Sequence, residues 1–209
     1  MRKLIQSAER VHLEAYFARV NWRAHLVPVV VAEIQNFLSD LKPLGLKNPY
    51  WSIVRDDANK GYYDNQKSEI WTDSITISLG FRPIRVNAVV PVKGRFRTLS
   101  ESQASLAISQ HVSGYVIAMI YPPSSDLAMP LKPFYVVDSW QNPGTVQPRQ
   151  IRKLLGIMME VDIFCGAEIY PNKKGTRLLT MLQAKDEILA NASRSYRWTQ
   201  TFHWVGLPS

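Results

Sequence analysis

The sequence contains almost no cysteine and no long apolar run. The chain of 209 residues has one cysteine, Cys165, so it cannot form an internal disulfide, and no oxidising compartment is implied. Its longest aliphatic stretches, 26–32 and 115–121, fall far short of the roughly 20 residues that a membrane-spanning helix requires. Residues 1–10 are basic but lack the apolar segment of a secretory signal. We therefore expect a soluble cytoplasmic protein with no membrane contact.

Motifs for metal, phosphate and nucleophile chemistry are also missing. The histidines, at positions 12, 25, 111 and 203, are scattered, whereas a zinc site needs several Cys or His ligands at short separations. The sequence has no Gly-x-x-x-x-Gly-Lys-Ser/Thr loop, no Gly-x-Gly-x-x-Gly loop and no Gly-x-Ser-x-Gly elbow. Cys165 follows apolar residues, which is typical of a buried, unreactive thiol. We predict no metal and no cofactor, and a non-enzymatic function is favoured.

Alternating apolar residues are the clearest structural signal in the chain. Period-two spacing places the side chains of one run on one face of a strand. With Gly80, Arg82 and Pro83 between them, two such runs predict neighbouring strands of a half-buried antiparallel sheet. The first run is Ile75, Ile77, Leu79 and Phe81, and the second is Ile84, Val86, Ala88, Val90 and Val92.

Other short runs predict the rest of the sheet. They cover about 104–112, 115–121 and 134–137, and a short strand over 52–55 is also compatible with the sequence. Residues 196–204 alternate again, which predicts an edge strand in the tail. The sheet core is expected within residues 69–140.

Helical periodicity is found at both ends of the chain. Two N-terminal helices within 2–42 are expected to pair as an antiparallel hairpin, and two C-terminal helices lie within 147–193. We predict one α+β domain over residues 1–209, with a mainly antiparallel sheet of about five strands covered by the terminal helices. The first helix is expected to bury the stripe Leu4, Ala8, Val11, Ala15 and Ala18.

The charge balance leaves several partners open. A net charge of +8 attracts polyanions, although it also serves solubility alone. The helix predicted from residue 148 opposes its own dipole at both ends, because cations occupy its start and carboxylates its end. An outside charge would compensate it, for example a phosphate at its start, or solvent would screen the cost. The residues are Arg149, Arg152, Lys153, Glu160 and Asp162.

An enzymatic site would have to use isolated polar residues. Asp138 follows a predicted strand and could act as a base, with His111 and Tyr121 as companions. The simpler interpretation is that Asp138 caps its own turn through the backbone. His111 and Ser113 share one strand face but lack a third orienting group, so a polar strand end is the simpler interpretation there as well.

Interleaved basic and aromatic residues favour binding over catalysis, because Tyr, Trp and Arg are enriched at interface hot spots. We predict a non-enzymatic protein that binds a protein partner, or itself, through Tyr196, Arg197, Trp198, Phe202 and Trp204. The alternative is nucleic-acid or nucleotide binding in a polyanion groove made by Arg85, Arg95, Arg97, Arg149, Arg152 and Lys153.

Overall fold

The computed structural model describes residues 2–44, 49–55, 71–84, 90–92, 95–97, 100–111, 113–125, 130–166 and 172–204. The helical segments are α1 (Arg2–Asn21), the π-helical turn η1 (Trp22–Leu26), α2 (Val27–Leu41), the 3₁₀ turns η2 (Lys42–Leu44) and η4 (Pro143–Thr145), α3 (Pro148–Cys165) and α4 (Lys173–Trp204). The strands are β1 (Tyr50–Arg55), β2 (Trp71–Ser78), β3 (Phe81–Pro83), β4 (Val90–Val92), β5 (Arg95–Arg97), β6 (Ser100–Ser102), β7 (Ser105–His111), β8 (Val116–Tyr121), β9 (Ser124–Ser125) and β10 (Tyr135–Trp140).

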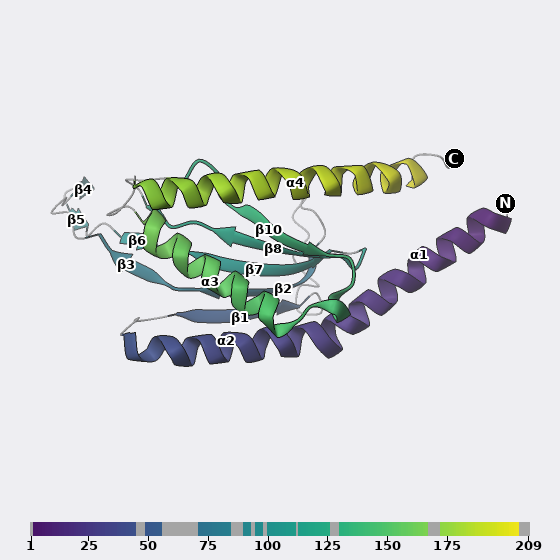
Figure 1. Cartoon of the computed structure of the whole chain (residues 1–209), viewed down its shortest axis with the longest axis horizontal. Helices are drawn as coiled ribbons and strands as arrows, with labels where there is room; N and C mark the ends of the chain where they lie inside the picture. The colour runs from purple at the N-terminus through teal and green to yellow at the C-terminus, as the bar shows by residue number, and fades with distance from the viewer. Residues whose placement is uncertain are drawn as a thin grey trace.

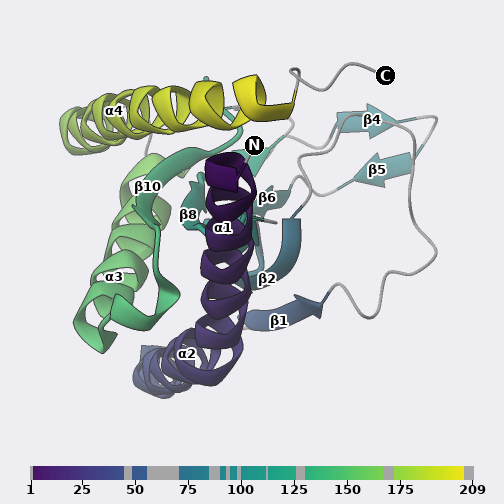
Figure 2. The ribbon, with the colours of Figure 1, turned by 90° about the vertical axis from the view of Figure 1, so that its right-hand side faces the viewer.

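Five strands form the main sheet in the order β1-β2-β7-β8-β10, and every neighbouring pair is antiparallel. Helices α2, α3 and α4 lie over one face of this sheet (Figure 1). The view in Figure 2 shows helices and sheet as two layers. The α+β class, the mainly antiparallel sheet of five strands and its cover of helices from both terminal regions are therefore confirmed.

Alternating side chains of the central strands form the core. Ile75 and Ile77 of β2 lie opposite Ile108 and Leu106 of β7, and all four are buried. Fully burying one such side chain contributes about 1.5–3 kcal/mol, so the contact between sheet and helices stabilises the whole fold. The helices cover these residues with Val30, Ile34, Ile151, Leu154, Leu155, Met158 and Leu182.

The two alternating runs of the middle segment do not pair with each other, so that prediction was wrong. The neighbours of β2 are β1 and β7. Gly80 has a φ of +98°, which turns the chain out of β2, and Phe81 is exposed rather than on the apolar face. Of the second run, β4 pairs with β5 in a separate two-stranded sheet, and residues 85–89 lie outside the described residues.

The predicted N-terminal hairpin is also wrong, because α1, η1 and α2 form one continuous helical run. Asn21, Leu26 and Val27 all have right-handed helical backbone angles. No glycine lies between residues 2 and 41 to end the helix, and Pro28 is in the first turn of α2. A proline lacks the N–H that an uninterrupted helix would use, and the π-helical turn before it accommodates that loss.

The tail of the chain is helical rather than an edge strand. Residues 196–204 continue α4, which runs from Lys173 to Trp204. The segment 176–204 contains neither glycine nor proline, so nothing in it breaks a helix, and the alternating aromatics carry only a small helix-propensity penalty. Here the helix that starts near residue 176 overrides the period-two pattern.

The turn between β7 and β8 holds α1 against the sheet. Gly114 in this turn has a φ of +91°, and a Cβ there would lie 2.5 Å from the Cβ of Ala18. Beside it, the amide nitrogen of the buried Gln110 side chain donates to the carbonyl oxygen of Ala18 at 3.1 Å. The glycine therefore permits both the turn and the close approach of the helix.

We expect Gly114→Ala to lower the free energy of unfolding by about 2–4 kcal/mol, because it adds a positive-φ penalty to a steric overlap with α1. Chemical denaturation followed by circular dichroism measures the change. Gly156→Ala is the matched control, since a Cβ at Gly156 in α3 meets nothing within 4 Å. That control should gain up to about 1 kcal/mol from helix propensity. Equal effects of the two substitutions would contradict the assigned role of Gly114.

Candidate interaction surface

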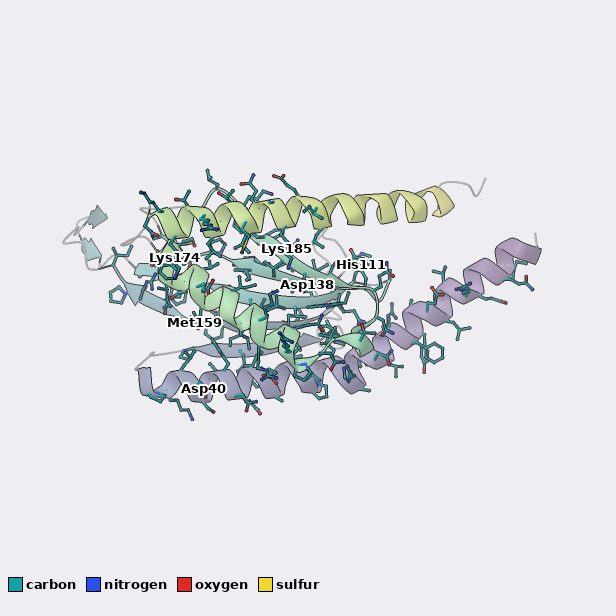
Figure 3. All side chains as sticks on the ribbon, in the orientation of Figure 1. Asp40, His111, Asp138, Met159, Lys174 and Lys185 are labelled. Atoms are coloured by element: carbon teal, nitrogen blue, oxygen red, sulfur yellow. The ribbon has the colours of Figure 1, made fainter. Side chains whose placement is uncertain are left out.

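The candidate catalytic residues do not form one site. The β7–β8 register pairs Tyr121 with Ser105, whereas His111 lies at the other end of β7. This separates the two residues by about 20 Å, at a strand rise of about 3.3 Å per residue. Figure 3 shows His111 at the hairpin end of the sheet and Asp138 nearer its centre. Burial raises the pKa of Tyr121, so its phenol stays protonated near neutral pH.

The side chains of Asp138 and His111 form hydrogen bonds with residues close to them in the sequence. Asp138 lies within β10, opposite Ala118, rather than in a turn after the strand as predicted, and its carboxylate accepts the backbone N–H of Ser139 at 2.9 Å. The Nδ1 atom of His111 lies 2.8 Å from Oγ of Ser113 and also accepts the backbone N–H of Ser113 at 3.1 Å. The His111 ring stacks on Tyr115 with centroids 4.6 Å apart. This arrangement is typical of a polar turn.

Neither an activated thiol nor a metal-binding cluster occurs among the described residues. Burial, with a smaller contribution from the charge of Asp162, raises the pKa of Cys165 to about 11, so little thiolate exists near neutral pH. Within the described part of the chain, no group of three or more His, Cys, Asp or Glu side chains could hold a metal ion.

The predicted polyanion residues are dispersed. Arg152 at the start of α3 forms an ion pair with Glu33 of α2, with Nε and Oε2 3.3 Å apart, while Arg149 and Lys153 are exposed. β5, which carries Arg95 and Arg97, lies far from the first turn of α3 in both views (Figures 1 and 2). Arg85 falls outside the described residues. The backbone therefore does not bring β5 and the first turn of α3 into one groove.

An arginine compensates the carboxylate at the end of α3. The Arg82 guanidinium donates to Asp162 Oδ2 at 3.2 Å and to Glu101 Oε2 at 2.7 Å. Asp162 also accepts from the Gln103 amide at 3.0 Å and from the backbone N–H of Ala104 at 2.8 Å. Both carboxylates are buried. The opposite charges at both ends of α3 therefore come from this chain. Arg82 pairs with Asp162 near the end of the helix, and Glu33 pairs with Arg152 near its start.

A row of exposed apolar side chains lies on α1. Four of its residues recur at i, i+3, i+4 and i+7, so they share one face of the helix. Their side chains are between 42% and 62% exposed. The rings of Tyr16 and Phe17 meet edge to face with centroids 5.8 Å apart. We call this face the α1 stripe: Leu13, Tyr16, Phe17 and Val20.

The end of α1 is fixed to the body, while its beginning projects. Trp22 and Leu26 of η1 are fully buried. Around them, the His25 Nε2 atom lies 3.0 Å from the carbonyl oxygen of Val146, and the Asn21 side chain donates to that of Asn142 at 3.1 Å. From this anchor α1 extends past the end of the sheet (Figure 1). A partner can therefore reach the α1 stripe without displacing the sheet.

The predicted buried stripe of α1 is confirmed only in part. Ala18 of the predicted buried stripe does face the β7–β8 turn, but Val11 is exposed. The helical spacing of Leu13, Tyr16 and Phe17 was visible in the sequence, and their large apolar side chains could have indicated this second face of α1. The interface predicted at Tyr196, Arg197, Trp198, Phe202 and Trp204 lies on the last turns of α4, where only the backbone is described.

No described helix is both long and apolar enough to cross a lipid bilayer. Comparison with protein-family models, with curated proteins and with solved structures gave no match.

Proposed function

We propose that this protein is a non-enzymatic interaction protein whose α1 stripe binds an amphipathic helix of a partner protein. The observation that carries the proposal is the stripe itself, a row of large apolar side chains left half-exposed on a projecting helix. A helix with apolar residues at i, i+3, i+4 and i+7 packs best against a second helix with a matching row. Aromatic side chains such as Tyr16 and Phe17 are common anchors of such contacts.

The charges beside the stripe favour a protein partner over a polyanion. Arg10 pairs with Glu14 on α1, with Nε and Oε1 2.9 Å apart and both side chains exposed. A surface with both signs lacks the single-sign field that attracts nucleic acid. The polyanion alternative receives less support, because Arg152 is already paired with Glu33, and β5, which carries Arg95 and Arg97, lies far from the start of α3.

The test compares two double variants of the full chain. Leu13→Ser with Phe17→Ser removes apolar side chains from the α1 stripe, and Met181→Ser with Ile188→Ser removes equally exposed ones from α4. A benzophenone amino acid at position 16 identifies the partner by cross-linking, and calorimetry with that purified partner measures affinity. Each lost side chain removes about 1–1.5 kcal/mol of burial, so the stripe variant should bind about 30-fold or more weakly.

The α4 variant should bind as the unmodified chain does, and both variants should keep its melting temperature, because the replaced side chains are largely exposed. Equal affinity of the stripe variant, or a partner that contacts the chain through an extended loop, would contradict the proposal.

A further inference from the structure

The two edges of the main sheet differ in their cover. At the β10 edge, α4 packs along the strand, and the Asp186 carboxylate accepts the backbone N–H of Val136 at 2.9 Å. The same carboxylate binds the Lys132 ammonium at 2.7 Å. Covering an edge with a helix and capping its N–H groups prevents another strand from pairing there.

The opposite edge, β1, carries no such protection among the described residues. β1 pairs there with β2 alone, in six consecutive residue pairs without a bulge. Residues 50–54 include no proline, glycine or charged residue, and Tyr50 and Val54 are 52% and 47% exposed. Proteins usually block an edge with charged residues, Pro or a bulge. Pro49 precedes β1 and Arg55 ends it, so the regular, uncharged part that can accept a further strand is residues 50–54.

The two faces of β1 differ, and this sets the pattern of any strand added to it. Trp51 and Ile53 pack against the core on the helix side and are partly buried. Tyr50, Ser52 and Val54 therefore alternate onto the other face. Residues of an added strand on the helix side would meet Trp51 and Ile53, and those on the other side would meet Tyr50 and Val54. Apolar or β-branched residues suit both sets of positions.

The position of α2 decides between a peptide and a second copy of the chain. In both views α2 lies beyond β1, on the helix-covered side of the sheet (Figures 1 and 2). A two-fold axis between two β1 strands would bring both α2 helices to the same side and into the same space. A single strand brings no such helix with it.

We propose that the β1 edge binds an extended peptide segment of a partner protein, which adds antiparallel to β1 with apolar or β-branched residues facing Trp51 and Ile53. Strand addition of this kind takes its affinity from main-chain hydrogen bonds and its specificity from alternate side chains. It does not rest on the α1 stripe, which lies on another element.

Hydrogen exchange on the full chain tests the proposal. The probe is a peptide of alternating valine and threonine flanked by lysines, with two further versions N-methylated on the valine amides or on the threonine amides. The unmethylated peptide should slow exchange of the outward-facing amides of residues 50–54 about tenfold or more. One methylated version should lose binding and the other keep it, because only one set of peptide amides faces β1.

Side-chain variants add a second measurement. Tyr50→Ser with Val54→Ser should weaken binding about fivefold or more by removing cross-strand contacts, and Phe81→Ser, exposed on β3 of the separate sheet, should leave it unchanged. Absence of binding, equal loss from both methylated peptides, or protection confined to α1 would overturn the proposal. Protection of residues 50–54 that rises with protein concentration without peptide would place a second copy at the edge and overturn it as well.

Discussion

Replacing Arg82 by methionine should lower the free energy of unfolding by about 3–5 kcal/mol. The substitution keeps an extended apolar side chain but removes the guanidinium that contacts both Glu101 and Asp162. Both carboxylates are nearly inaccessible to solvent. Removing one partner of a buried ion pair leaves an uncompensated charge in a medium of low dielectric constant, which is why the cost is large. Urea denaturation followed by circular dichroism gives the value.

An exposed ion pair provides the control for this substitution. Arg10→Met breaks the pair with Glu14 on the surface of α1 and should cost less than about 0.5 kcal/mol. Adding Glu101→Gln to Arg82→Met should recover part of the loss, because it neutralises one of the two buried carboxylates. A cost below about 1 kcal/mol for Arg82→Met would show that the carboxylates are stabilised by other contacts.

The Arg82 cluster also shows what a sequence pattern can and cannot supply. The unfavourable position of Asp162 near the end of α3 was evident from the sequence, and so was the need for an opposite charge. Its partner lies 80 positions away, on a short strand of a separate sheet. Local periodicity contains no information about that approach, so the pattern could not distinguish a cation supplied by this chain from screening by solvent.

The positions of the strands in the chain were easier to predict than which strands pair with each other. The alternation of Ile75, Ile77 and Leu79 follows from burial on one face, and it identifies β2 whichever strand lies beside it. The pairing of β2 with β7 joins residues about 30 positions apart, and it depends on packing of the whole sheet rather than on the turn after Gly80. The prediction that the two alternating runs are neighbouring strands was wrong for this reason.

Helix starts were predictable, whereas helix continuity was not. The helix predicted from residue 148 is α3, which begins at Pro148. Between α1 and α2, the sequence shows an apolar stripe that changes phase near Trp22. A turn between two helices and a π-helical insertion both produce such a change, and only the packing of Trp22 under the sheet distinguishes them.

Truncating that anchor, Trp22→Ala, should cost about 3–5 kcal/mol of unfolding free energy. The indole is completely buried and belongs to the core cluster, so alanine leaves a cavity next to η1 that the helical backbone cannot close. Denaturation followed by circular dichroism at 222 nm, rather than by tryptophan emission, avoids the change that the substitution makes to the fluorescence. Tyr16→Ala, on the exposed face of the same run, should stay within about 0.5 kcal/mol.

Trp22→Phe separates the apolar contribution of this side chain from its polar one. The Trp22 Nε1–H is buried and has no hydrogen-bond acceptor among the described residues. An unsatisfied buried donor costs about 1–3 kcal/mol, and phenylalanine removes that cost while retaining most of the ring contact. We therefore expect a loss below about 1.5 kcal/mol, with binding at the α1 stripe unchanged, since the anchor of α1 remains filled. A loss as large as that of Trp22→Ala would mean that the indole N–H is satisfied in solution.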